Sequence, residues 1–354
     1  MLNSICLQNS NQTLRLLGGL IGKSDCEISP ETYATFLKTQ EVYVRDRATM
    51  LAFKDAMEHN AQLFKGSVVL EVGCGSGILS MWAARQGAKR VIAVEPSDIA
   101  QVARQLVVQN RLDNVIQVFQ AKIELLKLPG GLKCVDIILS KWMGACLMYN
   151  SVIEDVIYAR NKWLRPGGSI FPQSAKLYVV ATEQDGRPSD VGQRWAHFGG
   201  LNLSRIGRVK THLPEVTDVD NTKILTKRHL LRSLDMRIVK HEDLSFEVPF
   251  RLRAVRQAFA SSFVVFFDFE FPGDKNMPAV STSPSGPSTQ WKQSLFPLDA
   301  HLPMRVDDVL KGNFKIVRSQ LHLDFDIDWS FANDLVTVKR HKQIYRMQGN
   351  TASI

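Results

Sequence analysis

Up to about residue 170, short and largely apolar runs alternate with stretches of helical spacing. The short runs lie at 68–70, 90–94, 115–119 and 134–139. The helical stretches lie at 46–64, 99–110 and 151–164. Apolar runs separated by helices are typical of a parallel sheet covered on both faces, which binds ligands at the carboxyl ends of its strands. The sequence therefore predicts a Rossmann-like, doubly wound α/β domain over 31–170.

Beyond about residue 170 the pattern changes to strict alternation. One segment places five apolar residues on a single face: Phe263, Val265, Phe267, Phe269 and Phe271. The segment 321–329 alternates apolar residues with histidine and aspartates in the same way. A period of two predicts strands with one buried face, so 171–354 is expected to form an antiparallel β-barrel or sandwich. Residues 195–206 interrupt it with a partly apolar, helix-like insert, and the polar residues 1–30 are expected to be flexible.

The segment 69–80, VLEVGCGSGILS, carries the clearest chemical signal. Gly73, Gly75 and Gly77 recur at every second position between an apolar run and a helical stretch. Glycines let backbone amides approach a ligand at a helix N-terminus. The next run ends in Glu95, where a carboxylate can accept both hydroxyls of a ribose. Such turns also pack helix on strand for purely structural reasons, but the pairing with Glu95 favours a nucleoside site, and loops of this shape are typical of S-adenosylmethionine sites.

Length and composition narrow the class of protein. A chain of 354 residues is natural for two domains. No apolar stretch reaches the roughly 20 residues that span a bilayer, and the start lacks a basic region with a cleavage site. We therefore expect no membrane partner and a cytoplasmic location, with the nucleus left open. Five cysteines without a Cys-x-x-Cys pair, and eight scattered histidines, indicate neither a disulfide framework nor a metal site.

The formal net charge of +9 leaves a nucleic acid or an acidic protein open as a partner. Basic clusters occur at 227–232 and at 339–342. Neither is interleaved with the aromatic residues that stack bases. Solvated faces explain these clusters better than an RNA site does.

Five motifs, taken in order, resemble the type I protein arginine methyltransferases: VLEVGCGSGILS, VIAVEPS, ILSKWMGACLMYNS, ARNKWLRPGGSIFP and TQWKQ. The resemblance runs from about Tyr33 to Met347. It implies a methyltransferase domain, then a β-barrel domain with a helical dimerisation arm at about 183–210, and ring-like dimers. It also implies that the residues holding the nucleoside are Gly73, Gly75, Gly77, Glu95 and Glu124.

The substrate side departs from this family's pattern. The family clamps the substrate guanidinium with two glutamates that flank a Trp-Met-Gly core, and those positions here are Lys141 and Asn150. A guanidinium keeps its proton and is held by carboxylates, whereas a lysine opposes a cationic substrate. Gln290 occupies the position of the family's histidine. The family's arginine, which pairs with the methionine carboxylate of the cofactor, falls at or near Thr49. Of the family's Tyr-Phe-x-x-Tyr motif only Tyr33 remains.

These departures predict a catalytically inactive, prozyme-like regulatory subunit that is not an enzyme on its own. We expect it to assemble with an active type I paralogue into a heterodimer or heterotetramer, with RNA-binding proteins among the substrates. Its S-adenosylmethionine site is expected to be vestigial, with weak or no binding. Five apolar arm residues are expected to dock on the partner: Trp195, Phe198, Leu201, Leu203 and Ile206. The alternatives are an active S-adenosylmethionine-dependent protein methyltransferase with an altered substrate, and an RNA-binding scaffold on the same fold.

Overall fold

The structure is a computed structural model that describes residues 30–183, 200–201, 213–273, 280–319 and 321–348. The chain divides into two compact units, residues 1–39 and 40–354. Helix α2 (Pro30–Arg45) begins in the first unit and ends in the second. Everything described below belongs to the second unit. Within the described ranges, no helix combines the length and the apolar character that crossing a bilayer requires.

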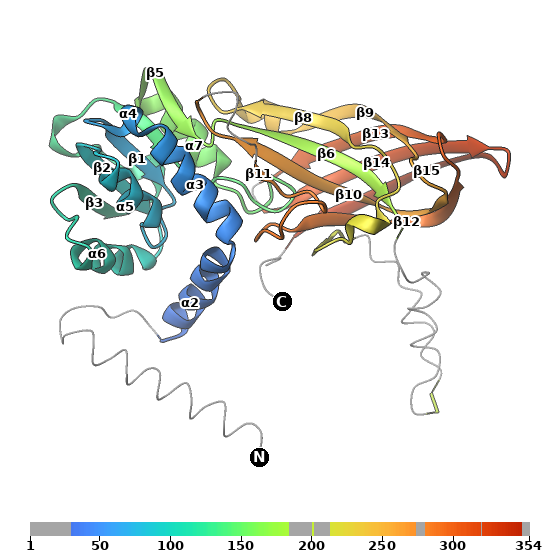
Figure 1. The fold of residues 1–354 in the computed structure, drawn as a ribbon, viewed down its shortest axis with the longest axis horizontal. Helices are drawn as coiled ribbons and strands as arrows, with labels where there is room; N and C mark the ends of the chain where they lie inside the picture. The colour runs from blue at the N-terminus through green and yellow to red at the C-terminus, as the bar shows by residue number, and fades with distance from the viewer. Residues whose placement is uncertain (1–29, 184–199, 202–212, 274–279, 320, 349–354) are drawn as a thin grey trace. The chain divides into compact units, whose positions relative to one another are not determined.

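A five-stranded parallel sheet organises the first half of this unit (Figure 1), with strand order β3-β2-β1-β4-β5. Its strands are β1 (Val68–Val72), β2 (Arg90–Glu95), β3 (Ile116–Gln120), β4 (Val135–Leu139) and β5 (Leu164–Phe171). The helices are α3 (Arg47–His59), α4 (Ala61–Phe64), α5 (Ile78–Arg85), α6 (Ile99–Gln109) and α7 (Ile153–Trp163), with short 3-10 turns η1 (Ile123–Leu125) and η2 (Pro129–Gly131). The order reverses between β1 and β4, which is where ligands bind in such sheets.

The predicted Rossmann-like domain is confirmed, with one local correction at the end of α7. The sequence predicted a helical stretch over 151–164, but α7 ends at Trp163 and β5 already begins at Leu164. The pairing of β4 with β5 shifts register there, which takes this segment out of the ladder. A Cβ at Gly168 would lie 2.8 Å from the carbonyl oxygen of Asp136. The glycine therefore marks a close approach between strands as well as a helix stop.

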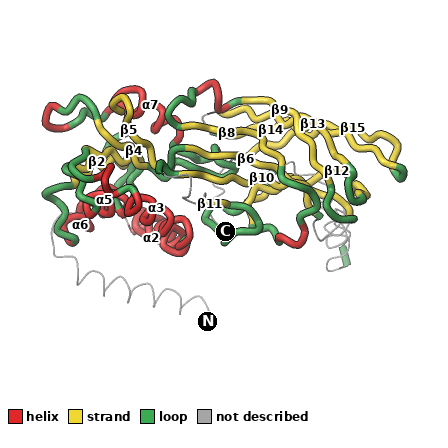
Figure 2. The backbone as a smooth tube through the Cα atoms, turned by 45° about the horizontal axis from the view of Figure 1, so that its top comes forward, coloured by secondary structure: helices red, strands yellow, loops and turns green. Residues whose placement is uncertain are grey.

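The second half consists of two antiparallel sheets, drawn as yellow strands in Figure 2. The larger has the order β7-β12-β10-β6-β8 with β11 beside β10, and the smaller the order β15-β14-β13-β9. The strands are β6 (Ser174–Thr182), β7 (Glu215–Thr217), β8 (His229–Asp235), β9 (Phe246–Arg253), β10 (Ala258–Glu270), β11 (Val280–Ser281), β12 (Gln293–Met304), β13 (Val309–Arg318), β14 (Leu323–Asn333) and β15 (Val336–Met347). Strand β8 contacts β9 and β12 contacts β15, so the sheets form a barrel-like domain, as predicted.

Aromatic side chains fill the space between these two sheets. The ring of Phe296 lies 4.7 Å from that of Phe325 and 5.3 Å from that of Tyr345, centroid to centroid. The predicted apolar face of β10 is buried, but Val264 and Phe266 on its other face are buried as well, in a small second cluster with Val180 and Leu295. The period of two therefore located the strand without showing that both of its faces are covered.

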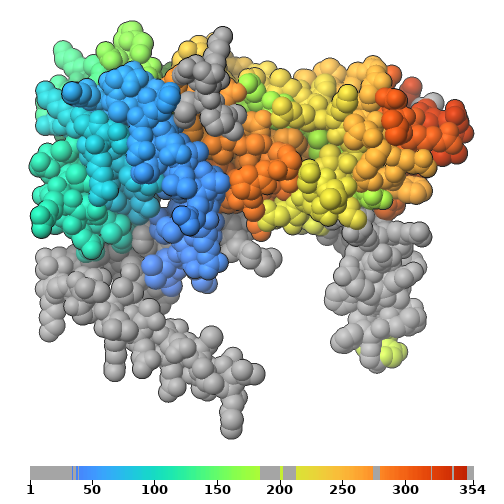
Figure 3. Space-filling model, viewed as in Figure 1, coloured from blue at the N-terminus to red at the C-terminus, as the bar shows by residue number. Residues whose placement is uncertain are grey.

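The parallel sheet domain packs directly on the barrel. The ring of Phe53 in α3 lies 4.9 Å from that of Phe271, and the Asn60 side-chain amide donates to the carbonyl oxygen of Pro272 over 2.9 Å. The space-filling view shows blue atoms of α3 against orange atoms of the barrel (Figure 3). Trp291 adds a bond from its indole nitrogen to the carbonyl oxygen of Met143 over 2.9 Å. Residues near 291 are thereby held against the carboxyl edge of the parallel sheet.

Candidate functional site

The glycine loop follows β1 at this carboxyl edge. Gly73, Gly75 and Gly77 have φ values of +71°, +52° and +77°, a region that favours glycine. The amides of Gly73 and Cys74 both donate to the carbonyl oxygen of Val94, at 2.9 and 3.0 Å. These bonds fix the loop against β2 and place Gly77 at the N-terminus of α5. The loop therefore has the backbone geometry that a nucleoside site requires.

Glu95 ends β2 beside this loop. One carboxylate oxygen accepts the amide of Gly75 over 3.0 Å, and the other accepts the amide and hydroxyl of Ser97 over 3.1 and 2.7 Å. The two hydroxyls of a bound ribose would replace some of these donors to the Glu95 carboxylate. Glu124 lies in η1, just after β3, with an exposed side chain. The glycine loop and Glu95 fit the adenosine end of S-adenosylmethionine, which when bound supplies an electrophilic methyl group, whereas the role of Glu124 stays a prediction.

The amino-acid end of such a ligand finds fewer partners. Thr49 is 1% exposed, and its hydroxyl oxygen makes no hydrogen bond within the described part of the chain. Its amide donates over 3.1 Å to Asp46, which caps α3. A buried threonine supplies no cation for a carboxylate. The described residues thus fit the adenosine part of S-adenosylmethionine well and its methionine part poorly.

The segment 141–152 forms a compact hairpin after β4. The amide of Gly144 donates to the carbonyl oxygen of Leu147 over 2.9 Å, and that of Val152 donates to that of Trp142 over 3.2 Å. A Cβ at Gly144 would lie 1.8 Å from the carbonyl oxygen of Tyr149, so only glycine fits there. The hairpin is held rigidly between its two ends.

Lys141 begins this hairpin and is partly buried. Its ammonium lies 3.3 Å from the side-chain oxygen of Gln290 and 2.9 Å from the centroid of the Tyr43 ring. Burial lowers the pKa of Lys141 to about 7, against the opposing effect of the charges on Asp46 and Glu71. The ammonium is therefore only partly protonated near neutral pH.

A hydrogen-bonded chain joins three of the positions that depart from the family's pattern. Asp46 accepts the amide of Gln290 on its second oxygen over 2.9 Å, and Gln290 accepts Lys141. Since Asp46 also accepts the amide of Thr49, Thr49 and Lys141 are linked through two residues. The sequence showed each substitution, but nothing in it signalled that they are connected across 244 positions.

Glu71 is a second titrating group that the sequence reading treated only as the end of a strand. It is 1% exposed, and burial raises its pKa to about 8, although hydrogen bonds from Ser80 oppose the shift. The Ser80 amide donates to it over 2.8 Å, and so does the Ser80 hydroxyl. Its place between Leu70 and Val72 of the apolar strand β1 was the signal available in the sequence.

Asn150 closes the hairpin in an exposed position with a φ of +51°, which asparagine tolerates. The next acidic residue, Glu154, pairs with Arg318 of β13 at 3.3 Å. Arg318 also donates to the hydroxyl of Ser151 over 3.1 Å and to the carbonyl oxygen of Met148. Glu154 thus contributes to the contact between α7 and the barrel.

This chain is similar to known proteins over both of its domains. A family model for a methyltransferase domain matches residues 69–168, and a model for the arginine methyltransferase oligomerization subdomain matches residues 173–334. Protein arginine N-methyltransferase 1 of Caenorhabditis elegans is 38% identical over 309 residues, which cover 86% of this chain and 88% of the relative. This chain belongs to the protein arginine methyltransferase family.

A solved arginine methyltransferase assembly is also similar. It is the Trypanosoma brucei PRMT1 enzyme-prozyme heterotetrameric complex with AdoHcy, with a TM-score of 0.82, 32% identity, and coverage of 88% of this chain and 98% of that chain. The similarity extends through both the sheet domain and the barrel.

The prediction that the chain is not an enzyme on its own is wrong. Relatives named protein arginine N-methyltransferase 1 range from 33% identity in Dictyostelium discoideum, over 93% of this chain, to 38% in Caenorhabditis elegans. This similarity points to an enzyme. The prediction rested on the departures at Lys141, Asn150, Gln290 and Thr49 and in the motif that ends at Tyr33, and it gave these few positions more weight than the rest of the arginine methyltransferase chain.

The expected docking residues of this arginine methyltransferase fall mostly outside the described residues. Leu201 is described and is 63% exposed. The others lie outside: Trp195, Phe198, Leu203 and Ile206.

Several cations of the two basic clusters have partners within the chain. Lys342 pairs with Asp326 at 2.8 Å and Arg232 with Asp243 at 2.8 Å. Arg228 lies 3.3 Å from Asp268. These ion pairs support solvated structural faces rather than an RNA site.

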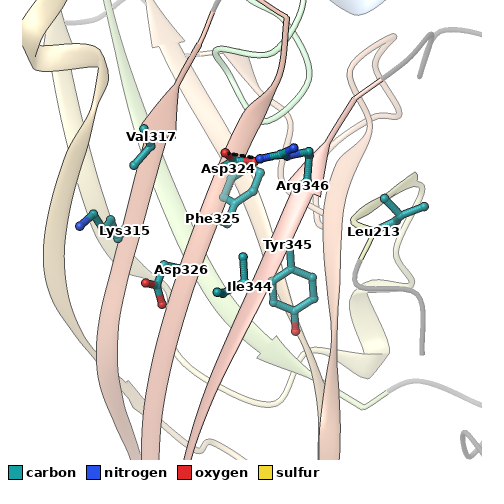
Figure 4. Close-up of a pocket in the computed structure, with 9 residues that line it drawn as sticks. All are labelled: Leu213, Lys315, Val317, Asp324, Phe325, Asp326, Ile344, Tyr345 and Arg346. Atoms are coloured by element: carbon teal, nitrogen blue, oxygen red, sulfur yellow. Dashed lines mark hydrogen bonds and ion pairs between the residues drawn. The ribbon is translucent and has the colours of Figure 1, made fainter. Parts of the chain in front are cut away.

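A groove on the barrel lies on a different sheet from the nucleoside site. It crosses β13, β14 and β15 and has a volume of about 430 Å³ (Figure 4). The ion pair of Arg346 with Asp324, at 2.6 Å, spans it. None of the residues predicted for the nucleoside or the acceptor lines it.

Proposed function

We propose that this chain acts as a regulatory subunit of a hetero-oligomeric protein arginine methyltransferase. It assembles with a second chain of the family and raises methyl transfer at that chain's site. The observation that carries the proposal is the ammonium of Lys141, which stands where the family's pattern has a carboxylate for the substrate. Two unit charges about 5 to 6 Å apart repel by about 3 kcal/mol at an effective dielectric constant of 20. A guanidinium is accordingly disfavoured beside Lys141.

Assembly is supported by two observations. The oligomerization subdomain matches over residues 173–334, and the similar solved structure from Trypanosoma brucei is an enzyme-prozyme heterotetramer. The barrel also has the dense aromatic core of a stable domain. A subunit can therefore keep its interaction surfaces while its acceptor side differs.

Mixing the subunits tests the proposal. Methyl transfer to an arginine-rich peptide is measured for this chain alone, for a type I arginine methyltransferase of the same organism alone, and for the two after co-expression. The rate of the mixture is expected to exceed the sum of the separate rates. A rate equal to that sum, or failure of the two chains to co-elute, would refute the proposal.

Exposed leucines offer a matched pair of variants for the interface. Leu201 is 63% exposed and lies in the proposed arm, whereas Leu335 is 58% exposed and lies between β14 and β15. Leu201→Ala is expected to weaken association about tenfold, the effect of losing a buried interface contact of about 1.4 kcal/mol. Leu335→Ala should leave association unchanged. Equal effects of both changes, measured by sedimentation, would argue against the arm.

A second candidate is a methyltransferase with an acceptor other than a guanidinium. It is favoured by the pKa of Lys141, about 7, which lets this side chain accept a proton near neutral pH. The test is transfer from labelled S-adenosylmethionine to arginine-free peptides by this chain alone. Transfer that persists in Lys141→Met would exclude this role for the lysine.

A further inference from the structure

Lys141 and the glycine loop share one edge of the parallel sheet. Strands β1 and β4 are adjacent and parallel, with Glu71 opposite Leu139. One residue on, the hydroxyl of Ser140 donates to the carbonyl oxygen of Val72 over 2.8 Å. Gly73 is the first residue after β1 and Lys141 the second after β4, so both lie at the carboxyl edge of these two adjacent strands. The side chain of Lys141 therefore leaves the backbone beside the first glycine of the loop.

The carboxylates near Lys141 are engaged with other donors. Both oxygens of Asp46 accept backbone amides, from Thr49 and from Gln290. Glu71 accepts two hydrogen bonds from Ser80, and its pKa of about 8 keeps it largely protonated at neutral pH. The charges of Asp46 and Glu71 oppose the effect of burial on the pKa of Lys141 but do not cancel it, so a ligand at this edge still meets a positive charge that is costly to bury.

Two natural ligands of a methyltransferase differ mainly in charge at this edge. S-adenosylmethionine carries a positively charged sulfonium, and S-adenosylhomocysteine carries a neutral thioether in its place. The adenine, ribose and amino-acid parts are identical. We propose that Lys141 makes the nucleoside site select S-adenosylhomocysteine over S-adenosylmethionine, so that this subunit binds the product of methyl transfer in preference to the donor. The inference rests on the candidate nucleoside site formed by the glycine loop and Glu95, but not on the partner subunit of the proposed function.

Protonation limits the size of this preference. Binding of a sulfonium can proceed if Lys141 gives up its proton, so the penalty equals the cost of deprotonation. With a pKa of about 7, binding of S-adenosylmethionine weakens about tenfold at about pH 6 and by only about 10% at about pH 8. The preference for the thioether therefore increases as the pH falls.

Other titratable groups face Lys141 and must be separated from it. They are Tyr43 of α2, Asp46 ahead of α3, and Glu71 of β1, with Glu95 of β2 beside Tyr43. Glu71 also gains negative charge as the pH rises, which favours a sulfonium in the same direction. Lys141→Met keeps all four groups. A difference in ligand preference between the wild type and this variant is therefore due to Lys141.

Calorimetric titration with each ligand, at about pH 6 and about pH 8, tests the inference. From the higher to the lower pH, the ratio of the dissociation constants, donor over product, should rise about tenfold more in the wild type than in Lys141→Met, in which Glu71 still titrates. Lys89→Met removes the same charge from an exposed position and should behave as the wild type. A ratio independent of pH in the wild type, or a preference retained in Lys141→Met, overturns the inference. Failure of both ligands to bind overturns it as well, whereas activation of a partner would still be measurable in the mixing experiment.

Discussion

Replacing Lys141 by methionine should remove a component of stability that depends on pH. Burial lowers the pKa of Lys141 from 10.5 to about 7, which corresponds to about 5 kcal/mol at 1.36 kcal/mol per unit. Below about pH 7 the lysine is charged in both states, and the folded state bears the full cost of desolvation. Between about pH 7 and pH 10.5 the unfolded chain binds the extra proton, so stability rises with pH.

The measurable part of this effect lies between about pH 7 and pH 9. There the wild type should gain about 2 kcal/mol in the free energy of unfolding relative to Lys141→Met. Urea denaturation at a series of pH values gives this difference, provided that the slope with denaturant is the same for both proteins. Lys89→Met is the control, because its side chain is exposed and its curve should run parallel to the wild type. Parallel curves for the wild type and Lys141→Met would refute the burial argument.

Two further substitutions test the hairpin and its contact with the barrel. Gly144→Ala should destabilise the protein by about 1 to 3 kcal/mol or prevent folding, because the new Cβ would overlap the carbonyl oxygen of Tyr149. The control is Ala145→Gly, one position on, which should cost at most about 1 kcal/mol. Thermal denaturation measures both. Arg318→Met should cost about 1 to 3 kcal/mol because it leaves Glu154 and the carbonyl oxygen of Met148 without this partner; an unchanged melting temperature would contradict the role given to Arg318.

The sequence predicted those parts of the fold in which one local pattern determines one element. Strands β1 to β4 were located because their runs are short and largely apolar and alternate with helices of clear spacing. The start of β5 at Leu164 was missed, because Pro166 and Gly167 read as a helix stop although β5 passes through them. Local patterns do not show whether a glycine ends an element or permits a close approach.

The candidate site was predictable only residue by residue. Gly73, Gly75 and Glu95 follow from spacing along the chain, and the structure places them together. The link between Asp46 and Gln290 joins residues 244 positions apart, and no local pattern encodes such a contact. The pKa of Glu71 depends on how deeply β1 is buried, which is a property of the assembled sheet.

Arg318 couples the position of the barrel to that of the hairpin. It belongs to β13 of the four-stranded sheet, while Met148, Ser151 and Glu154 belong to the hairpin and the helix that follows it. Hydrogen bonds fail within a few tenths of an ångström of their limit, so the end of β13 cannot shift without breaking these bonds or dragging the segment along. Strain applied to the barrel by a neighbouring subunit would thus reach the acceptor side through the guanidinium of Arg318, in addition to the bonds that Gln290 and Trp291 make to the hairpin.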